Sequence, residues 1–152
     1  MDTKQEIERK LSVLVGLPFW NGGRVHNLLM LEFGQRREVA GSAGPRAVGD
    51  YALHIECPWR IVGPLGIAVG SDDRGYPPDG FKGSRDQWDR ENSESLWDSR
   101  LRALMTTFSD NIIDAVQADT VGGIRLVLRN LHAIEVFPCS SREIEHWRLV
   151  RR

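Results

Sequence analysis

Apolar residues near the start of the chain recur at helical spacing. The stripe comprises Ile7, Leu11 and Leu14. Thr3 and Glu6 stand in the spacing of a capping box, in which a hydroxyl and a carboxylate satisfy free N–H groups of the first helical turn. Gly16 and Pro18 follow as helix-ending residues. The pattern predicts an amino-terminal helix.

Short apolar or alternating runs further along the chain are typical of strands. The predicted strands comprise residues 25–33, 51–57, 59–62, 65–69, 124–128, 131–137 and 146–150. Residues 19–23 are interpreted as a turn and residues 35–50, rich in Gly, Ala, Arg and Pro, as a loop. A second helix is predicted from about Ser93, and Asp110 is expected to cap a short third helix. Hairpin-length links between strands favour antiparallel pairing.

The order of elements in residues 3–62 recurs in residues 93–150. Each half places a helix before a strand, then a second strand with an Ile-Glu pair, a proline and Trp-Arg. The matching pairs are Ile55-Glu56 with Trp59-Arg60, and Ile134-Glu135 with Trp147-Arg148. Because strand neighbours point to opposite faces, both tryptophans are expected in the core. We predict one α+β domain over residues 1–152, with a mainly antiparallel sheet, helices on one side, and two similar αβββ halves that share one sheet or pack two.

Residues 71–92 form the least regular stretch of the chain. This polar segment combines Asp, Gly and Pro with aromatic residues that nothing in the local pattern demands. The aromatic residues are Tyr76, Phe81 and Trp88. Long structureless loops are uncommon in compact domains and are usually functional or disordered. The aromatic rings are expected either to pin the segment to the body or to meet a partner.

Composition narrows the class of protein. The chain has 152 residues, of which 41% are hydrophobic and 27% charged, which is typical of one globular domain. A net charge of -1 gives no electrostatic reason to bind nucleic acid or an anionic membrane, so neither is expected as a partner. The amino terminus is charged and lacks the apolar core of a signal peptide, which favours the cytoplasm.

Cys57 and Cys139 form no CxxC motif and are interpreted as buried thiols. Arginine outnumbers lysine heavily, which favours a bacterial genome of high GC content.

Residues 49–61 carry a distinctive run, Gly-Asp-Tyr-Ala-Leu-His-Ile-Glu-Cys-Pro-Trp-Arg-Ile. It resembles the signature of an uncharacterised bacterial protein family with a Gly-acidic-aromatic-Ala-Leu-His-aliphatic-x-Cys-x-Trp-Arg core. Residues 67–72, 135–138 and 145–149 resemble the same family, which brings no activity with it. The chain is also similar, more loosely, to small α+β immunity proteins of bacterial toxin systems. That resemblance implies binding to a partner protein.

The candidate chemistry is sparse. His54 and Glu56 lie two residues apart on one strand face, where they could bind a metal or exchange a proton, and Glu135 could join them. A zinc site needs three or four ligands, so a polar cross-strand pair is the simpler interpretation. Asp72 and Asp73 do not match the ligand spacing of a calcium loop, and a solvated acidic segment is favoured over a metal site.

These observations favour a non-catalytic protein-binding module, immunity-like in kind, without metal or cofactor. The alternative is a metal-assisted or acid–base enzyme that uses His54, Glu56 and Glu135. The candidate binding residues are His54, Glu56, Asp72, Asp73, Arg74, Tyr76, Phe81 and Trp88. The chain is expected to be a monomer or a homodimer, the latter through a free sheet edge.

Overall fold

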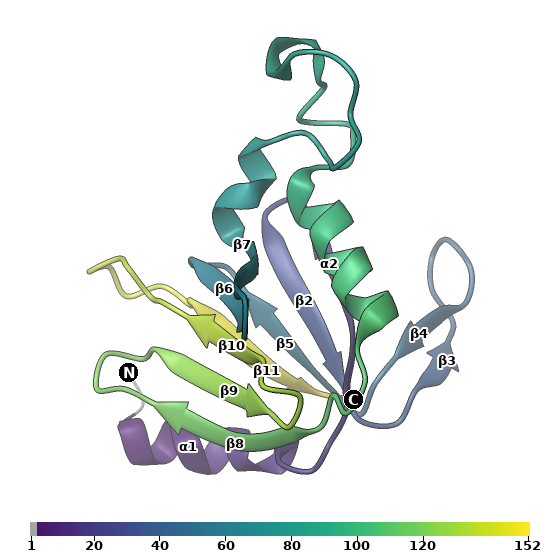
Figure 1. Ribbon diagram of the computed structural model, residues 1–152. Helices are drawn as coiled ribbons and strands as arrows, with labels where there is room; N and C mark the ends of the chain where they lie inside the picture. Colours follow the sequence, from purple (N-terminus) through teal and green to yellow (C-terminus); the bar gives the residue numbers. More distant parts are fainter. Residues whose placement is uncertain (1–2) are drawn as a thin grey trace.

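The computed structural model describes residues 3–152. Its α-helices are α1 (Lys4–Leu11) and α2 (Leu96–Thr107), and its short 3-10 helices are η1 (Ser12–Leu14), η2 (Ser71–Gly75) and η3 (Arg85–Gln87). The strands are β1 (Phe19–Val25), β2 (Leu28–Phe33), β3 (Arg37–Val39), β4 (Arg46–Val48), β5 (Tyr51–Ile55), β6 (Trp59–Gly63), β7 (Gly66–Gly70), β8 (Ile113–Ala118), β9 (Ile124–Leu128), β10 (Ala133–Val136) and β11 (Trp147–Arg151). Figure 1 shows their arrangement. Among the described residues, no helix is both long and apolar enough to cross a lipid bilayer.

The strands form two main antiparallel sheets and a separate hairpin. One sheet has the order β1-β2-β5-β11, the other the order β7-β6-β10-β9-β8, and β3 pairs with β4 alone. The predicted α+β class with mainly antiparallel pairing is confirmed. Of the two arrangements left open for the halves, two sheets are found. Helix α1 packs against β8 of the five-stranded sheet, and α2 packs against β1 of the four-stranded sheet. Helix α2 also packs against β7 of the five-stranded sheet, so it contacts both sheets.

Each half of the chain gives its last repeated strand to the other half's sheet. Strand β6 pairs with β10, where Trp59 lies opposite Val136, and β11 pairs with β5, where Trp147 lies opposite Ile55. Ile55 and Val136 are thus equivalent in space, whereas the Ile-Glu match in the sequence is displaced by two residues. A shift of two preserves the side-chain face, so the sequence match and the strand register place the same side chains inward with an offset of two residues.

Backbone contacts repeat across the two halves. Gly34 N–H donates to Pro18 O at 2.9 Å, and Arg129 N–H donates to Ile112 O at 3.0 Å. Pro18 and Ile112 also pair with each other in an isolated antiparallel β-bridge. The two halves of the chain therefore contact each other at these two matching positions. The hairpins β1–β2 and β8–β9 both shift register near the start of their first strand. The two halves therefore share one backbone design, and each needs the other to complete its sheet.

The first hairpin differs from the sequence prediction. Residues 19–23 belong to β1 and are not a turn, and the turn lies at His26 and Asn27, inside the predicted strand 25–33. A glycine suits position 22 of this strand, because a Cβ atom there would lie only 3.0 Å from Leu101 Cδ2 of α2. The glycine marks a close approach of helix and strand, which local sequence cannot distinguish from a turn.

Two further segments are strands where other structure was predicted. Residues 110–116 were expected to form a helix capped by Asp110, but they lead into and form β8, which pairs with β9. Asp110 adopts a φ of 48°, a left-handed conformation, and the following β-branched residues suit the pleated sheet. The predicted loop 35–50 contains the β3–β4 hairpin.

One core unites both sheets and both helices. Its fully buried side chains include Leu31, Leu53, Leu126 and Ile134, each 0% exposed. The predicted capping box of α1 is confirmed, since Thr3 Oγ1 accepts from Glu6 N–H and Glu6 accepts from Thr3 N–H. Trp59 is buried as predicted, while Trp147 packs against the core half-buried.

Candidate functional site

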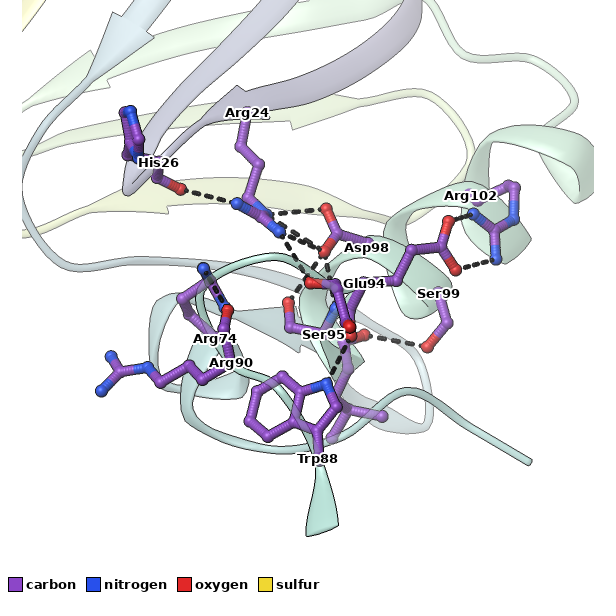
Figure 2. Close-up of polar contacts among 12 residues, drawn as sticks. Arg24, His26, Arg74, Trp88, Arg90, Glu94, Ser95, Asp98, Ser99 and Arg102 are labelled. Carbon is purple, nitrogen blue, oxygen red and sulfur yellow. Dashed lines mark hydrogen bonds and ion pairs between the residues drawn. The ribbon is translucent and has the colours of Figure 1, made fainter. Parts of the chain in front are cut away.

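Residues 71–95, here called the arm, project from the body between β7 and α2 (Figure 1). The arm has few regular elements, but side chains hold it together. Arg74 Nη2 donates to Arg90 O at 2.8 Å, and Trp88 Nε1 donates to Glu94 O at 2.8 Å (Figure 2). Trp88 is buried, so this ring pins the arm and does not face a partner. The arm is therefore a built structure and not a loose loop.

Ion pairs tie the arm to helix α2. Arg100 Nε donates to Asp79 Oδ2 at 2.7 Å, and Arg102 pairs with Glu94. These hydrogen bonds hold the pKa of both carboxyl groups below their ordinary values. Leu96 N–H also donates to Tyr76 O at 2.9 Å. The two ends of the arm are thus joined to each other and to the helix that follows.

A bidentate pair links the base of the arm to β1. Arg24 Nε lies 2.8 Å from Asp98 Oδ1 and Arg24 Nη2 lies 2.8 Å from Asp98 Oδ2 (Figure 2). Asp98 also accepts from Ser95 N–H at 2.7 Å, at the first turn of α2. Burial acts to raise the pKa of Asp98, but the hydrogen bonds from Arg24 and Ser95 outweigh it and lower the pKa. Asp98 is therefore held as an anion that fixes the helix start to the first hairpin.

A pocket of about 310 Å³, here called the base pocket, lies where the arm leaves the body. Its walls come from the β1–β2 turn, the β5–β6 connection, η2, the arm and α2. The side chains that matter most are those of Glu56, Trp59, Asp72, Arg74, Arg90 and Trp97. Residues far apart in sequence thus converge at this one place.

The walls of the base pocket hold buried donors without acceptors. Arg74 Nε, Arg74 Nη1, Trp59 Nε1 and Trp97 Nε1 have no hydrogen-bond partner, and among the described residues only His54 Nε2 shares this state. The two indoles meet edge to face with centroids 4.8 Å apart. Burial, and then the nearby Arg24, lower the pKa of Arg74. Each buried unpaired polar group lowers the stability of the fold by roughly 1–3 kcal/mol, so this cluster of unpaired donors is destabilising.

The three residues of the enzyme alternative do not converge. His54 lies in β5 between Met30 and Arg148, in the four-stranded sheet. Glu135 lies in β10 of the other sheet, where it accepts from Arg60 at 2.7 Å and Arg125 at 3.3 Å. Glu56 is exposed beyond the end of β5, at the base pocket. Within residues 3–152, no group of three or more His, Cys, Asp or Glu side chains could hold a metal ion.

His54 is nevertheless unusual. Its Nδ1 lies 3.5 Å from Arg148 Nη2, and its Nε2 is buried without a partner. Burial, and then the charges of Arg148 and Arg152, lower its pKa. These effects favour the neutral imidazole, which lies half-buried in the four-stranded sheet, apart from the arm.

The other candidate residues divide between support and exposure. Asp73 accepts from Gly70 N–H at 2.9 Å and closes the first turn of η2. Asp72 lies at the base pocket. Tyr76 is 49% exposed, with the Arg85 guanidinium 4.6 Å from its ring centroid. Phe81 is half-buried. Of the predicted aromatic residues, Tyr76 thus presents the most accessible ring.

Sequence reasoning missed several residues of the site. Trp59 is predicted to lie in the core and is buried, but its free indole N–H could not be foreseen, and neither could that of the buried Trp97. Arg24 and Asp98 were not singled out. Asp98 had a readable signal, since it stands three residues after Ser95 in a capping-box spacing.

The two cysteines differ from each other. Cys57 is buried, and this burial, together with nearby Cys139, raises its thiol pKa to about 11. Cys139 is exposed, against the prediction that both thiols are buried, because the chain has left β10 at Val136 and runs on as an irregular segment.

Comparison with known proteins adds no relative to this description. No protein-family model matches the chain, and neither a curated protein nor a solved structure is significantly similar to it.

Proposed function

We propose that this protein is a non-catalytic module that binds a partner protein through the exposed side of the arm. The observation that carries the proposal is the contact between Tyr76 and Arg85. The Arg85 guanidinium stacks on the solvent-exposed Tyr76 ring, on an arm that internal contacts hold in place. Tyrosine and arginine are enriched among the residues that dominate binding energy at interfaces. An ordered arm has also lost much of its conformational freedom before the partner arrives, which lowers the cost of association.

The chemistry of the chain supports a reducing compartment as the cellular setting. Cys57 and Cys139 are both free thiols, which suits a reducing compartment, and we place the binding in the bacterial cytoplasm. The loose resemblance of the sequence to immunity proteins of bacterial toxin systems makes a toxin of such a system the first partner to test. The acid–base alternative lacks comparable support, because His54, Glu56 and Glu135 lie at separate places.

The test is site-specific photo-crosslinking in the native host, followed by affinity measurement with the purified partner. A benzophenone amino acid replaces Tyr76 in one variant and Leu65 in another, because Leu65 is fully exposed at the β6–β7 turn, the end of β7 opposite the arm. We expect one stoichiometric adduct from position 76 and none from position 65.

The purified partner then distinguishes contact from proximity. Tyr76→Ala is expected to weaken its binding by about 30-fold, the loss of roughly 2 kcal/mol that is typical of a dominant interface residue. Leu65→Ala is the matched control and leaves the affinity unchanged. Equal adducts from both positions, or unchanged affinity of Tyr76→Ala, would refute the proposal. Trp88→Ala is unsuitable as a surface variant, because Trp88 is buried and pins the arm.

A further inference from the structure

The base pocket has a counterpart in the other half of the molecule. Trp147 is the equivalent of Trp59, since each begins an exchanged strand opposite an equivalent residue. Trp147 Nε1 donates to Gly122 O at 2.9 Å, a carbonyl of the β8–β9 turn. The equivalent β1–β2 turn consists of His26 and Asn27 alone, and no acceptor reaches Trp59 Nε1. The indole N–H at this position is thus hydrogen-bonded in one half of the molecule and unpaired in the other.

All the unpaired groups in the walls of the base pocket are donors. An indole N–H and a guanidinium donate hydrogen bonds and cannot accept them. Their complement must therefore bring acceptor oxygens. Glu56 and Asp72 also line the pocket and place negative charge there, which disfavours a dianion such as phosphate. A singly charged group with several acceptor lone pairs meets both conditions.

We propose that the base pocket binds a small carboxylate, which accepts hydrogen bonds from Arg74 and from the indoles of Trp59 and Trp97. The volume of about 310 Å³ is at the lower end of the range for small-molecule sites. The four unpaired nitrogens expose no surface, so the carboxylate reaches them only when the side chains around them move, including a turn of the Arg74 side chain toward it. Such a turn releases one hydrogen bond, from Arg74 Nη2 to Arg90 O.

This inference is independent of the proposed protein partner. Tyr76 and Arg85 do not line the base pocket. A Tyr76→Ala variant therefore keeps carboxylate binding, even where it loses the partner, and the two proposals succeed or fail separately.

The test is an NMR titration of the tryptophan indole N–H groups. The chain has five tryptophans, hence five indole signals, and Trp59→Phe and Trp97→Phe assign the two that matter. Sodium acetate is the probe, and sodium chloride and sodium phosphate at matched ionic strength are the controls. We expect acetate to shift the Trp59 and Trp97 signals to saturation and to leave the Trp147 signal in place, because Trp147 is already paired.

Arginine variants test the donor itself. Arg74→Met is expected to weaken acetate binding by about tenfold or more, equivalent to roughly 1.4 kcal/mol. Arg142→Met is the matched control, because Arg142 is exposed between β10 and β11 and does not line the base pocket, and its affinity stays that of the wild type. The proposal is overturned by indole signals that do not saturate with acetate, by tighter binding of phosphate than of acetate, or by Arg74→Met binding as the wild type does.

Discussion

Trp59 and Trp147 begin the two exchanged strands, but only Trp147 has an acceptor for its indole. Around Trp147 the β8–β9 turn is long and rigid, because Asp119 Oδ1 accepts from the N–H groups of Val121 and Gly123, each at 2.8 Å. Around Trp59 the corresponding turn is short, and the arm brings Arg74 in its place.

This difference separates two roles, stability and binding, within a scaffold of two similarly ordered sheets. The segments that repeat between halves form the sheets and the core, and they carry stability. The segments that do not repeat, above all the arm and the two hairpin turns, carry exposed rings, charges and unpaired donors. Binding residues commonly lie on irregular segments held by a rigid scaffold. The asymmetry of the two halves therefore points to the arm and its base as the functional part.

The largest expected effect tests whether matching core positions of the two halves contribute equally to the free energy of unfolding. Leu31 and Leu126 are equivalent core residues in β2 and β9, and both are fully buried. Leu31→Ala and Leu126→Ala should each lower the free energy of unfolding by about 3 kcal/mol, through lost burial and the cavity left behind. Urea unfolding followed by tryptophan fluorescence measures both. Because the halves exchange strands, each variant should unfold in one transition, and two separate transitions would contradict the shared core.

A smaller effect sharpens the contrast between paired and unpaired arginines near the arm. Arg24→Met leaves the mostly buried Asp98 carboxylate without its bidentate partner and should cost about 2–3 kcal/mol of unfolding free energy. Arg74→Met removes one hydrogen bond but also a buried charge with two unpaired donors, so its cost should stay within about 1 kcal/mol. Urea unfolding again gives both values. An equal cost for the two variants would mean that the donors of Arg74 are satisfied after all.

Local signals in the sequence predicted much of this fold. The capping box at Thr3, the second helix, the pair β9–β10 and the recurring order of elements all follow from patterns within a few residues. The errors arose where tertiary contacts override such patterns. Gly22 suggested a turn but accommodates Leu101, and the real turn uses His26 in a left-handed conformation that histidine seldom adopts.

The candidate site was predicted in part for the same reason. Glu56, Asp72 and Arg74 were named from their residue types, and the structure brings all three to the base pocket. Its other walls, Trp59 and Trp97, come from β6 and α2, and no local spacing relates them. Whether an indole finds an acceptor depends on the length of a hairpin turn elsewhere in the chain, which only the assembled fold reveals.

The smallest expected effect concerns those two turns. His26 and Gly122 both adopt positive φ, 52° and 87°, and only the glycine does so without strain. A Cβ atom at Gly122 would meet Pro138 Cγ at an ordinary 3.7 Å, so Gly122→Ala tests the backbone conformation alone and should cost about 1 kcal/mol. His26→Gly relieves strain but loosens the unfolded chain, so its gain should be only about 0.5 kcal/mol, while the His26 carbonyl still accepts from Arg24. Urea midpoints at constant slope give both changes. Changes of opposite sign in the free energy of unfolding mean that each turn imposes its backbone conformation on the residue at that position. Changes of the same sign would mean that the surrounding contacts, and not φ, decide the stability of these turns.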